Sequence, residues 1–335
     1  MPASVDIDSS QFPENVRAEL LAGLRSRRIN HKFHYDSVKQ VMQWLALQQA
    51  YSPECTDLDY GAIYHQAFAE AITRIPETAV HLVGLGCGGG QKDVRLIKEL
   101  RKRGGEVFYT PLDVSTAMVL VARSAALEAI SPSHCFPFVC DLAIIEDLPK
   151  QLEQRVATLG QESSANRKVA RLFTFFGMIP NFEPQMILPK LEHLLAPQDY
   201  LLFSANLAPG DNYKQGVQHV LPLYDNKLTR EWLMTFLLDL GVNRSDGRIH
   251  FMIEDADDLK RISAYFDFTQ PLELQIDAER FAFRPGDSIR LFFSYRHTPS
   301  LVRSLLAEHK LDVLDQWITA SEEEGVFLVR PRALA

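Results

Sequence analysis

Apolar residues at helical spacing dominate the first part of the chain. Between residues 13 and 50 the segments AELLAGL and VKQVMQWL repeat apolar side chains every three or four positions. That spacing gathers the apolar side chains on one face and predicts two amphipathic helices. The piece between them, RRINHKFHYD, sets aromatic residues such as Tyr35 beside charges. It is predicted to be a loop, which either lines a site or packs on the surface.

The middle of the chain alternates apolar runs with amphipathic segments. After a helix predicted over residues 60–73, strands are predicted at 80–85 and 106–112, near Asp141, in VARLFTFFG and in YLLFSAN. Helices are predicted between and after them, at residues 92–102, 115–129, 148–159 and 186–195. Because a helical crossover joins strands that run in parallel, this order predicts an α/β fold with a doubly wound, Rossmann-like sheet.

Residues 208–285 break that alternation. They hold a predicted helix over 229–240 and strand-like runs such as IHFMIE and ERFAF. The tail then adds IRLFFSYR, a helix and two closing strands. A chain of 335 residues can bury two cores. We therefore predict a second α+β lobe from residues 1–75 and 206–286, and a main α/β domain from residues 76–205 and 287–335.

Charge and cysteine usage limit the classes of partner that the chain is expected to bind. The formal net charge is -8 and the basic residues are scattered, which disfavours a nucleic-acid groove. The N-terminus has no apolar stretch, so we expect a cytoplasmic protein without a membrane partner. The sequence contains no CxxC pair and no HExxH spacing, so we predict no metal site. The thiols are interpreted as reduced packing residues: Cys55, Cys87, Cys135 and Cys140.

The strongest local signal is a glycine-rich turn between the first predicted strand and its helix, HLVGLGCGGGQKDVRLI. Glycines allow the backbone to approach a ligand closely, and helix N-termini present free N–H groups. The turn therefore predicts a cofactor site that includes Gly84, Gly86 and Gly88. Their G-x-G-x-G spacing differs from the dinucleotide fingerprint, but Gly84, Gly86 and Gly89 also fit G-x-G-x-x-G. A NAD-dependent dehydrogenase therefore stays open as an alternative.

Two carboxylates follow the next strands. Asp113 ends the second strand, 25 residues after Gly88, where an acid can accept both ribose hydroxyls. It can instead cap the following helix, although Ser115 suits that role equally well. Asp141 follows the third strand and is predicted to contact the adenine ring edge, or else to act as a loop or cap residue.

Eight collinear motifs give the chain a family resemblance. They are KFHYDS, QQAYSP, LVGLGCGGGQK, TPLDVS, CDL, FFGMIPNFEP, VLPLYDN and GDSIRLFFSYR. Together they cover nearly the whole chain and resemble the histidine-specific, S-adenosylmethionine (SAM)-dependent methyltransferase family. The resemblance implies a seven-stranded class I methyltransferase sheet that binds SAM and an α+β lobe that binds an amino-acid acceptor. It assigns cofactor contacts to Gly84, Gly86, Gly88, Lys92, Asp113, Asp141 and Gly177.

The same resemblance assigns the acceptor site to Tyr51, Asn181, Tyr224, Phe292 and Ser294, with Asn181 and Tyr35 as catalytic residues. The amide oxygen of Asn181 can accept an N–H from an amine and orient its lone pair. The two acceptor-site tyrosines can hydrogen-bond a carboxylate and shield an ammonium group. The alternatives are a turn asparagine after Pro180, tyrosines that only pack, and a solvated Lys92.

Departures from the family pattern bear on the substrate. Phe292 stands where the family carries a glutamate two residues before the pocket serine, here Ser294. An imidazole loses its anionic partner by this change, so we expect an acceptor other than histidine, with Phe251 as a further aromatic wall. A glutamate of the first strand is replaced by Gly84, and the segment before Asn181 is one residue shorter. A non-catalytic SAM- or amine-binding protein is therefore a second alternative.

Overall fold

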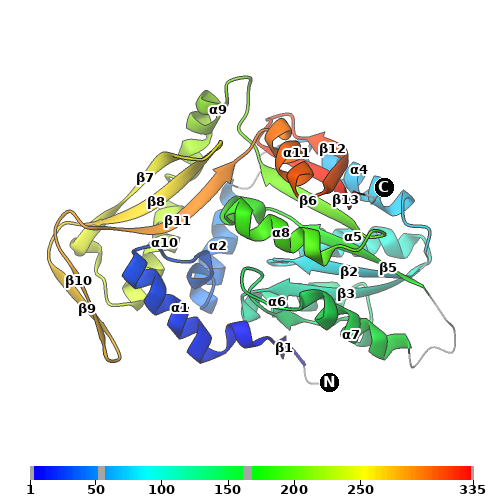
Figure 1. Cartoon of the computed structure of the whole chain (residues 1–335), viewed down its shortest axis with the longest axis horizontal. Helices are drawn as coiled ribbons and strands as arrows, with labels where there is room; N and C mark the ends of the chain where they lie inside the picture. The colour runs from blue at the N-terminus through cyan, green and yellow to red at the C-terminus, as the bar shows by residue number, and fades with distance from the viewer. Residues whose placement is uncertain (1–3, 52–56, 78, 161–167, 333–335) are drawn as a thin grey trace.

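The computed structural model describes residues 4–51, 57–77, 79–160 and 168–332. Cys55 therefore lies outside the described residues. A mostly parallel sheet of eight strands forms the larger half of the molecule (Figure 1). In spatial order its strands are β1 (Asp6–Ile7), β4 (Phe138–Val139), β3 (Glu106–Asp113), β2 (Ala79–Leu85), β5 (Val169–Phe175), β6 (Tyr200–Asn206), β13 (Glu324–Pro331) and β12 (Leu311–Ile318). Strand β13 runs antiparallel to both of its neighbours, β6 and β12, and the other described strand pairs of this sheet are parallel.

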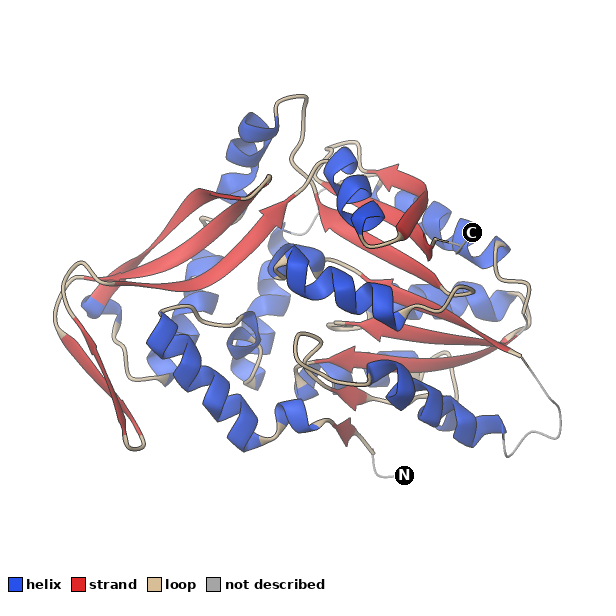
Figure 2. Ribbon diagram, viewed as in Figure 1, coloured by secondary structure: helices blue, strands red, loops and turns tan. Residues whose placement is uncertain are grey.

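Helices cover both faces of this sheet (Figure 2). One face packs against α4 (Tyr60–Thr73), α5 (Gln91–Lys102) and α6 (Thr116–Ala126), and the other against α7 (Leu148–Gly160), α8 (Pro184–Leu194) and α11 (Pro299–Glu308). Successive residues of β2 point to opposite faces, so Leu82 joins the first core and Val83 the second. A strand buried on both faces must be apolar throughout, which explains the continuous apolar runs of the sequence.

The second lobe is built around a three-stranded antiparallel sheet of order β11, β8, β7. Figure 1 shows this sheet beside the central one. Its strands are β7 (Gly247–Ala256), β8 (Leu259–Phe268) and β11 (Ser288–Arg296), with the hairpin β9 (Leu272–Ile276) and β10 (Glu279–Phe283). Its helices are α1 (Pro13–Ser26), the 3-10 helix η2 (His31–His34), α2 (Val38–Tyr51), α9 (Tyr213–Val220) and α10 (Lys227–Asp239). Apart from α9, these parts share a core that includes Leu24, Trp232 and Phe266. Helix α9 packs in a smaller cluster with Ile262 of β8.

The α/β class and the parallel Rossmann-like sheet are confirmed. Seven strands match predicted runs, and the eighth is the two-residue edge strand β1, which pairs with β4. Two segments lie elsewhere than expected. Residues 60–73, grouped with the second lobe, form α4 and pack on the central sheet. IRLFFSYR, grouped with the main domain, forms β11 and pairs with β8 of the second sheet.

Candidate functional site

A cavity of about 750 Å³ lies where the carboxyl ends of the central strands face the second lobe. Ligands of open α/β sheets bind at this edge because the loops after the strands meet there. Both halves of the molecule contribute walls. The sequence-predicted residues on its walls are Tyr35, Tyr51, Gly86, Gly88, Lys92, Asp113, Asp141, Gly177, Asn181, Tyr224, Phe292 and Ser294. Gly84 lies inside β2 and is not a lining residue, so its effect on the cavity is indirect.

The glycine turn forms the cofactor end of the cavity. Gly86 and Gly88 have φ angles of 62° and 52°, a conformation that L side chains adopt rarely. The turn is fastened to β3, because the Cys87 N–H donates to the Leu112 carbonyl at 2.9 Å and the Gly88 N–H to Asp113 Oδ2 at 3.0 Å. Helix α5 starts directly after the turn, so its N-terminal N–H groups face the same space.

Asp113 joins the turn to the second strand. Its Oδ1 accepts the Ser115 N–H at 3.0 Å and its Oδ2 the Gly88 N–H. Burial raises the pKa of this carboxyl, and the backbone hydrogen bonds oppose that rise. The hydroxyl of Ser115 caps α6 by accepting the Met118 N–H. The cap role considered for Asp113 therefore belongs to Ser115, and the Asp113 carboxylate keeps acceptor capacity toward the cavity.

A carboxylate that we did not predict lies beneath the turn. Asp93, in the first turn of α5, is 3 % exposed and lines the cavity. Tyr109 and Thr174 each donate a hydroxyl hydrogen bond of 2.7 Å to it. Burial raises the pKa of Asp93 to about 6. The sequence carried a signal for it, since Asp93 shares the apolar face of α5 with Leu96 and Leu100.

Lys92 lies at the cavity wall with its ammonium group directed to protein groups. Its Nζ is 3.7 Å from Glu324 Oε1 and 4.8 Å from the centre of the Tyr64 ring. Tyr64 donates its hydroxyl to the same Glu324 carboxylate. An aromatic and anionic surrounding of this kind holds a lysine in place. The alternative of a solvated surface lysine is therefore wrong.

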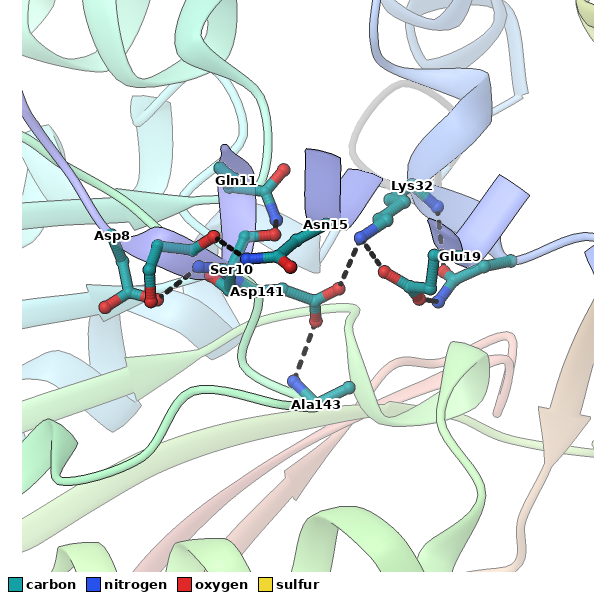
Figure 3. A network of polar contacts seen from close by, with 10 residues as sticks. Asp8, Ser10, Gln11, Asn15, Glu19, Lys32, Asp141 and Ala143 are labelled. Carbon is teal, nitrogen blue, oxygen red and sulfur yellow. Dashed lines mark hydrogen bonds and ion pairs between the residues drawn. The ribbon is translucent and has the colours of Figure 1, made fainter. Parts of the chain in front are cut away.

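Asp141 belongs to a polar network with the N-terminal segment (Figure 3). Its Oδ1 accepts the Ala143 N–H at 2.8 Å, and its Oδ2 lies 3.2 Å from Lys32 Nζ. The Asp141 N–H donates to the hydroxyl of Ser10. Lys32 also pairs with Glu19 of α1. The carboxylate that we expected at an adenine edge thus holds Lys32 of the second lobe against the main domain.

The loop after β5 brings Gly177 and Asn181 to the cavity. Gly177 has a φ of 68°, and its N–H donates to the Ser204 hydroxyl at 2.8 Å. Asn181 ends the short 3-10 helix Ile179–Asn181, and its side chain makes no hydrogen bond with any described residue. Its amide oxygen and nitrogen are therefore available to a ligand.

Tyr224 and Ser294 meet although 70 residues separate them in sequence. Their hydroxyl oxygens are 2.9 Å apart. Arg296 Nε donates to the Tyr224 hydroxyl at 3.1 Å, and Asn206 Nδ2 at 3.4 Å. Arg296 is 5 % exposed, its Nη1 donates to the Leu207 carbonyl at 2.9 Å, and it forms no ion pair within the described parts of the chain. We did not predict it. Its position on the same strand face as Phe292 and Ser294 was the available signal.

Aromatic rings form the wall beside this polar group. Phe292 lies 5.8 Å from Trp232 and 4.9 Å from His31, and Tyr35 lies 5.5 Å from Trp232, between ring centres. Burial lowers the pKa of His31 well below its ordinary value, so its ring is neutral. Burial and the charge of Asp113 raise the pKa of Tyr35. Phe251, expected as a further wall, does not line the cavity and packs in the apolar core instead.

The three cysteines that the structure describes are free thiols. Burial raises the pKa of Cys87, Cys135 and Cys140, so they stay protonated thiols, as expected of packing residues. Within the described ranges no group of His, Cys, Asp and Glu side chains has the arrangement of a metal site. Nor does any helix described there have the length and apolarity to cross a bilayer.

Comparison with known proteins adds a family match, one curated relative and two solved structures. The family model for "Histidine-specific methyltransferase, SAM-dependent" matches residues 16–331. The N-methyltransferase imqF of Aspergillus flavus is 27 % identical over 274 residues, which cover 78 % of this chain and 70 % of imqF.

Among solved structures, a S-adenosylmethionine-dependent methyltransferase from Clostridium acetobutylicum aligns with a TM-score of 0.46 at 13 % identity, covering 87 % of this chain and 99 % of that one. Magnesium protoporphyrin IX methyltransferase from Synechocystis, solved with S-adenosylhomocysteine (SAH), aligns with a TM-score of 0.44 at 11 % identity, covering 88 % and 95 %.

Proposed function

Because the chain belongs to the histidine-specific, SAM-dependent methyltransferase family, we propose that it methylates a nitrogen of a small amine or amino acid whose side chain is aromatic or apolar. The family match rejects the NAD-dependent oxidoreductase. One observation carries the proposal: a single cavity joins the glycine turn and Asp113 to the polar group of Tyr224, Ser294 and Arg296 and to an aromatic wall.

The residues at the cofactor end fit an adenosyl group. Gly86 and Gly88, whose φ angles are positive, bring no side chain into the turn. Asp113, with lone pairs left after its backbone hydrogen bonds, would accept the ribose hydroxyls, and the backbone after Asp141 would border the adenine. When bound, SAM supplies an electrophilic methyl group on a sulfonium. We therefore assign the central-sheet half of the chain to the cofactor and the second lobe to the acceptor.

The residues at the other end suit an amino acid. Tyr224 and the Arg296 guanidinium place hydrogen-bond donors and a buried positive charge where a carboxylate would bind. Asn181 would accept an N–H of the amine and so turn its lone pair toward the cofactor end. Tyr35 and Tyr51 also line the cavity and would exclude water from the nitrogen. Catalysis would then rest on orientation and desolvation of a neutral amine.

Phe292 argues against histidine as the acceptor. Its ring packs against the rings of Trp232 and His31, and neither of these neighbours carries a carboxylate. An imidazole N–H placed there would lose its hydrogen bond to water without gaining a partner. An aromatic or apolar side chain loses no hydrogen bond and gains ring contacts. The acceptor lobe therefore favours amino acids such as tryptophan, tyrosine, phenylalanine or leucine.

The test is turnover with an acceptor panel. The purified chain is incubated with SAM and each of those four amino acids, histidine and simple amines. SAH release and the mass gain of one or more methyl groups on the acceptor are measured. We expect methylation of at least one aromatic or apolar amino acid at a higher kcat/KM than histidine. Preferred methylation of histidine would reject the acceptor assignment. SAH binding without release of product from any acceptor would favour the non-catalytic alternative.

A further inference from the structure

Asp93 differs from the other buried carboxylates of the cavity. Glu324 pairs with Lys92, Asp141 pairs with Lys32, and Asp113 accepts backbone N–H groups. Asp93 accepts hydrogen bonds from two neutral hydroxyls, and the charge of the neighbouring Lys92 offsets only part of its desolvation. No ion pair to Asp93 occurs among the residues the structure describes. A buried carboxylate without a directly paired cation is costly to keep ionised. A cationic ligand that enters the cavity would remove that cost.

Gly84 makes room for the Asp93 carboxylate. A Cβ built on Gly84 would overlap Asp93 Oδ2 and lie 3.2 Å from both Asp93 Cγ and the Tyr109 hydroxyl. Residue 84 cannot carry a side chain while Asp93 holds this position. Gly84 is also the strand position where the family pattern carries a glutamate. In this chain the carboxylate has therefore moved from β2 to the first turn of α5, and Asp93 stands in the space of the missing strand side chain.

We propose that Asp93 is the anionic contact for the α-ammonium group in the amino-acid part of SAM. This assignment rests on the proposed function. The adenosyl part is expected at Asp113 and the loop after β4, so the amino-acid part extends past the glycine turn, beneath which Asp93 lies. Tyr109 from β3 and Thr174 from β5 flank β2 and hold the carboxylate from both sides, which fixes its orientation toward the ligand.

The first experiment compares two ligands on two proteins. SAH carries the α-ammonium, and 5′-methylthioadenosine lacks the amino-acid part altogether. Their dissociation constants are measured by calorimetry at near-neutral pH for the wild type and for Asp93→Asn, which keeps the side-chain shape. Loss of a charge-assisted contact should weaken SAH binding about 10- to 100-fold and methylthioadenosine binding by less than about twofold. Equal weakening of both ligands, or of neither, would overturn the proposal.

The second experiment returns the carboxylate to the strand. Asp93→Ala frees the space that Gly84→Asp then fills, so the double variant should regain at least half of the lost binding free energy for SAH. Thermal unfolding verifies that each variant folds. A folded double variant that binds SAH no better than Asp93→Ala alone would overturn the assignment. A wild-type chain that binds neither ligand rejects the proposed function itself, and this inference with it.

Discussion

In the proposed function, Phe292 is the residue on which acceptor choice should depend most directly. Its ring closes the side of the cavity that Trp232 and His31 also border. Phe292→Glu would bury a carboxylate among rings and should lower kcat/KM for aromatic or apolar acceptors by about 100-fold. The same change should raise relative activity toward histidine, because the glutamate accepts an imidazole N–H.

The matched control for that change is Phe292→Leu, which keeps the wall apolar. It should lower kcat/KM for the same acceptors by less than about tenfold. Steady-state kinetics with the preferred acceptor and with histidine separates the two variants. An equal loss in Phe292→Glu and Phe292→Leu would show that ring size, and not charge, controls the acceptor.

Tyr224 offers a second test at the scale of one atom. Its hydroxyl meets Ser294, Arg296 and Asn206, so Tyr224→Phe removes one group and leaves three polar partners without it. We expect the KM for the amino-acid acceptor to rise about 10- to 100-fold, since one hydrogen bond to a charged group is worth roughly 1.5–3 kcal/mol. The SAH dissociation constant should stay unchanged. A loss of SAH affinity of similar size would place Tyr224 in the cofactor site.

The junction between β2 and α5 is the most demanding element. Gly90 precedes α5 with a φ of 74°, and a Cβ there would lie 2.9 Å from the Ala122 Cα of α6. Gly90→Ala should therefore lower the free energy of unfolding by roughly 2–4 kcal/mol, through strain and overlap together. Gly104 has the same φ and open space around it. Gly104→Ala should lower the free energy of unfolding by only about 1 kcal/mol. Urea titration of both variants measures the two values.

The N-terminal segment is fastened to the main domain by Lys32. This lysine is 7 % exposed and pairs with Asp141 and with Glu19 of α1. Lys32→Met would leave a buried carboxylate without its cation and should lower the free energy of unfolding by about 3 kcal/mol. Arg25→Met removes the exposed pair with Glu279 and should cost less than about 1 kcal/mol. Equal losses would mean that the Lys32 pair behaves like a surface contact.

Element-level prediction from the sequence succeeded where the signal is local. Each apolar run of a buried strand, like the glycine turn, is a short continuous stretch of sequence, so the local pattern is sufficient to identify it. The partner of β11 depends on contacts with β8, which begins about thirty residues earlier, and β11 is buried along nearly its whole length. The hydrophobic pattern of β11 therefore could not show in which of the two sheets this strand pairs.

The prediction of the candidate site also depended on how local the signal is. Most residues predicted from motifs line one cavity, whereas Gly84 and Phe251 do not line it. Asp93 and Arg296 were missed because an ionised residue on an apolar face looks like an exception until its partners are known. Those partners lie far away in sequence: Tyr109 and Thr174 reach Asp93 from two other strands.

For the whole molecule, acid should destabilise the fold through its buried histidines. Burial lowers the pKa of His34 and His297 from 6.5 to about 4, and that of His81 to about 3. As the pH falls below 6.5 the unfolded chain binds these protons first. The stabilising contribution is therefore complete above pH 6.5 and is lost on the way down to about 4. For His34 and His297 it amounts to about 3 kcal/mol each.

Asp93 acts in the opposite direction. Its pKa is raised from 3.8 to about 6, so the folded state holds that proton more tightly. Its contribution to stability is complete below pH 3.8 and is lost as the pH rises through about 6. The summed contribution of the buried histidines is larger than that of Asp93. We therefore expect circular dichroism to show cooperative unfolding between pH 6.5 and 4.

His297 allows that prediction to be tested. Neither ring nitrogen of His297 has a hydrogen-bond partner among the described residues, so a phenylalanine of similar size loses no bond there. His297→Phe should shift the midpoint of acid unfolding to lower pH. His193→Gln, on the exposed side of α8, should leave it unchanged. An identical midpoint in all three proteins would assign acid unfolding to other groups.

Strand β11 has an evolutionary consequence. It belongs to the second sheet, yet its alternate residues Phe292, Ser294 and Arg296 reach the cavity that the glycine turn closes from the opposite side. If the proposed function holds, three codons on one strand would control which acceptor is methylated, while the donor half keeps its own sequence constraints. Gene duplicates of such a protein could then acquire new acceptors by single-nucleotide steps, without rebuilding the half that binds the methyl donor.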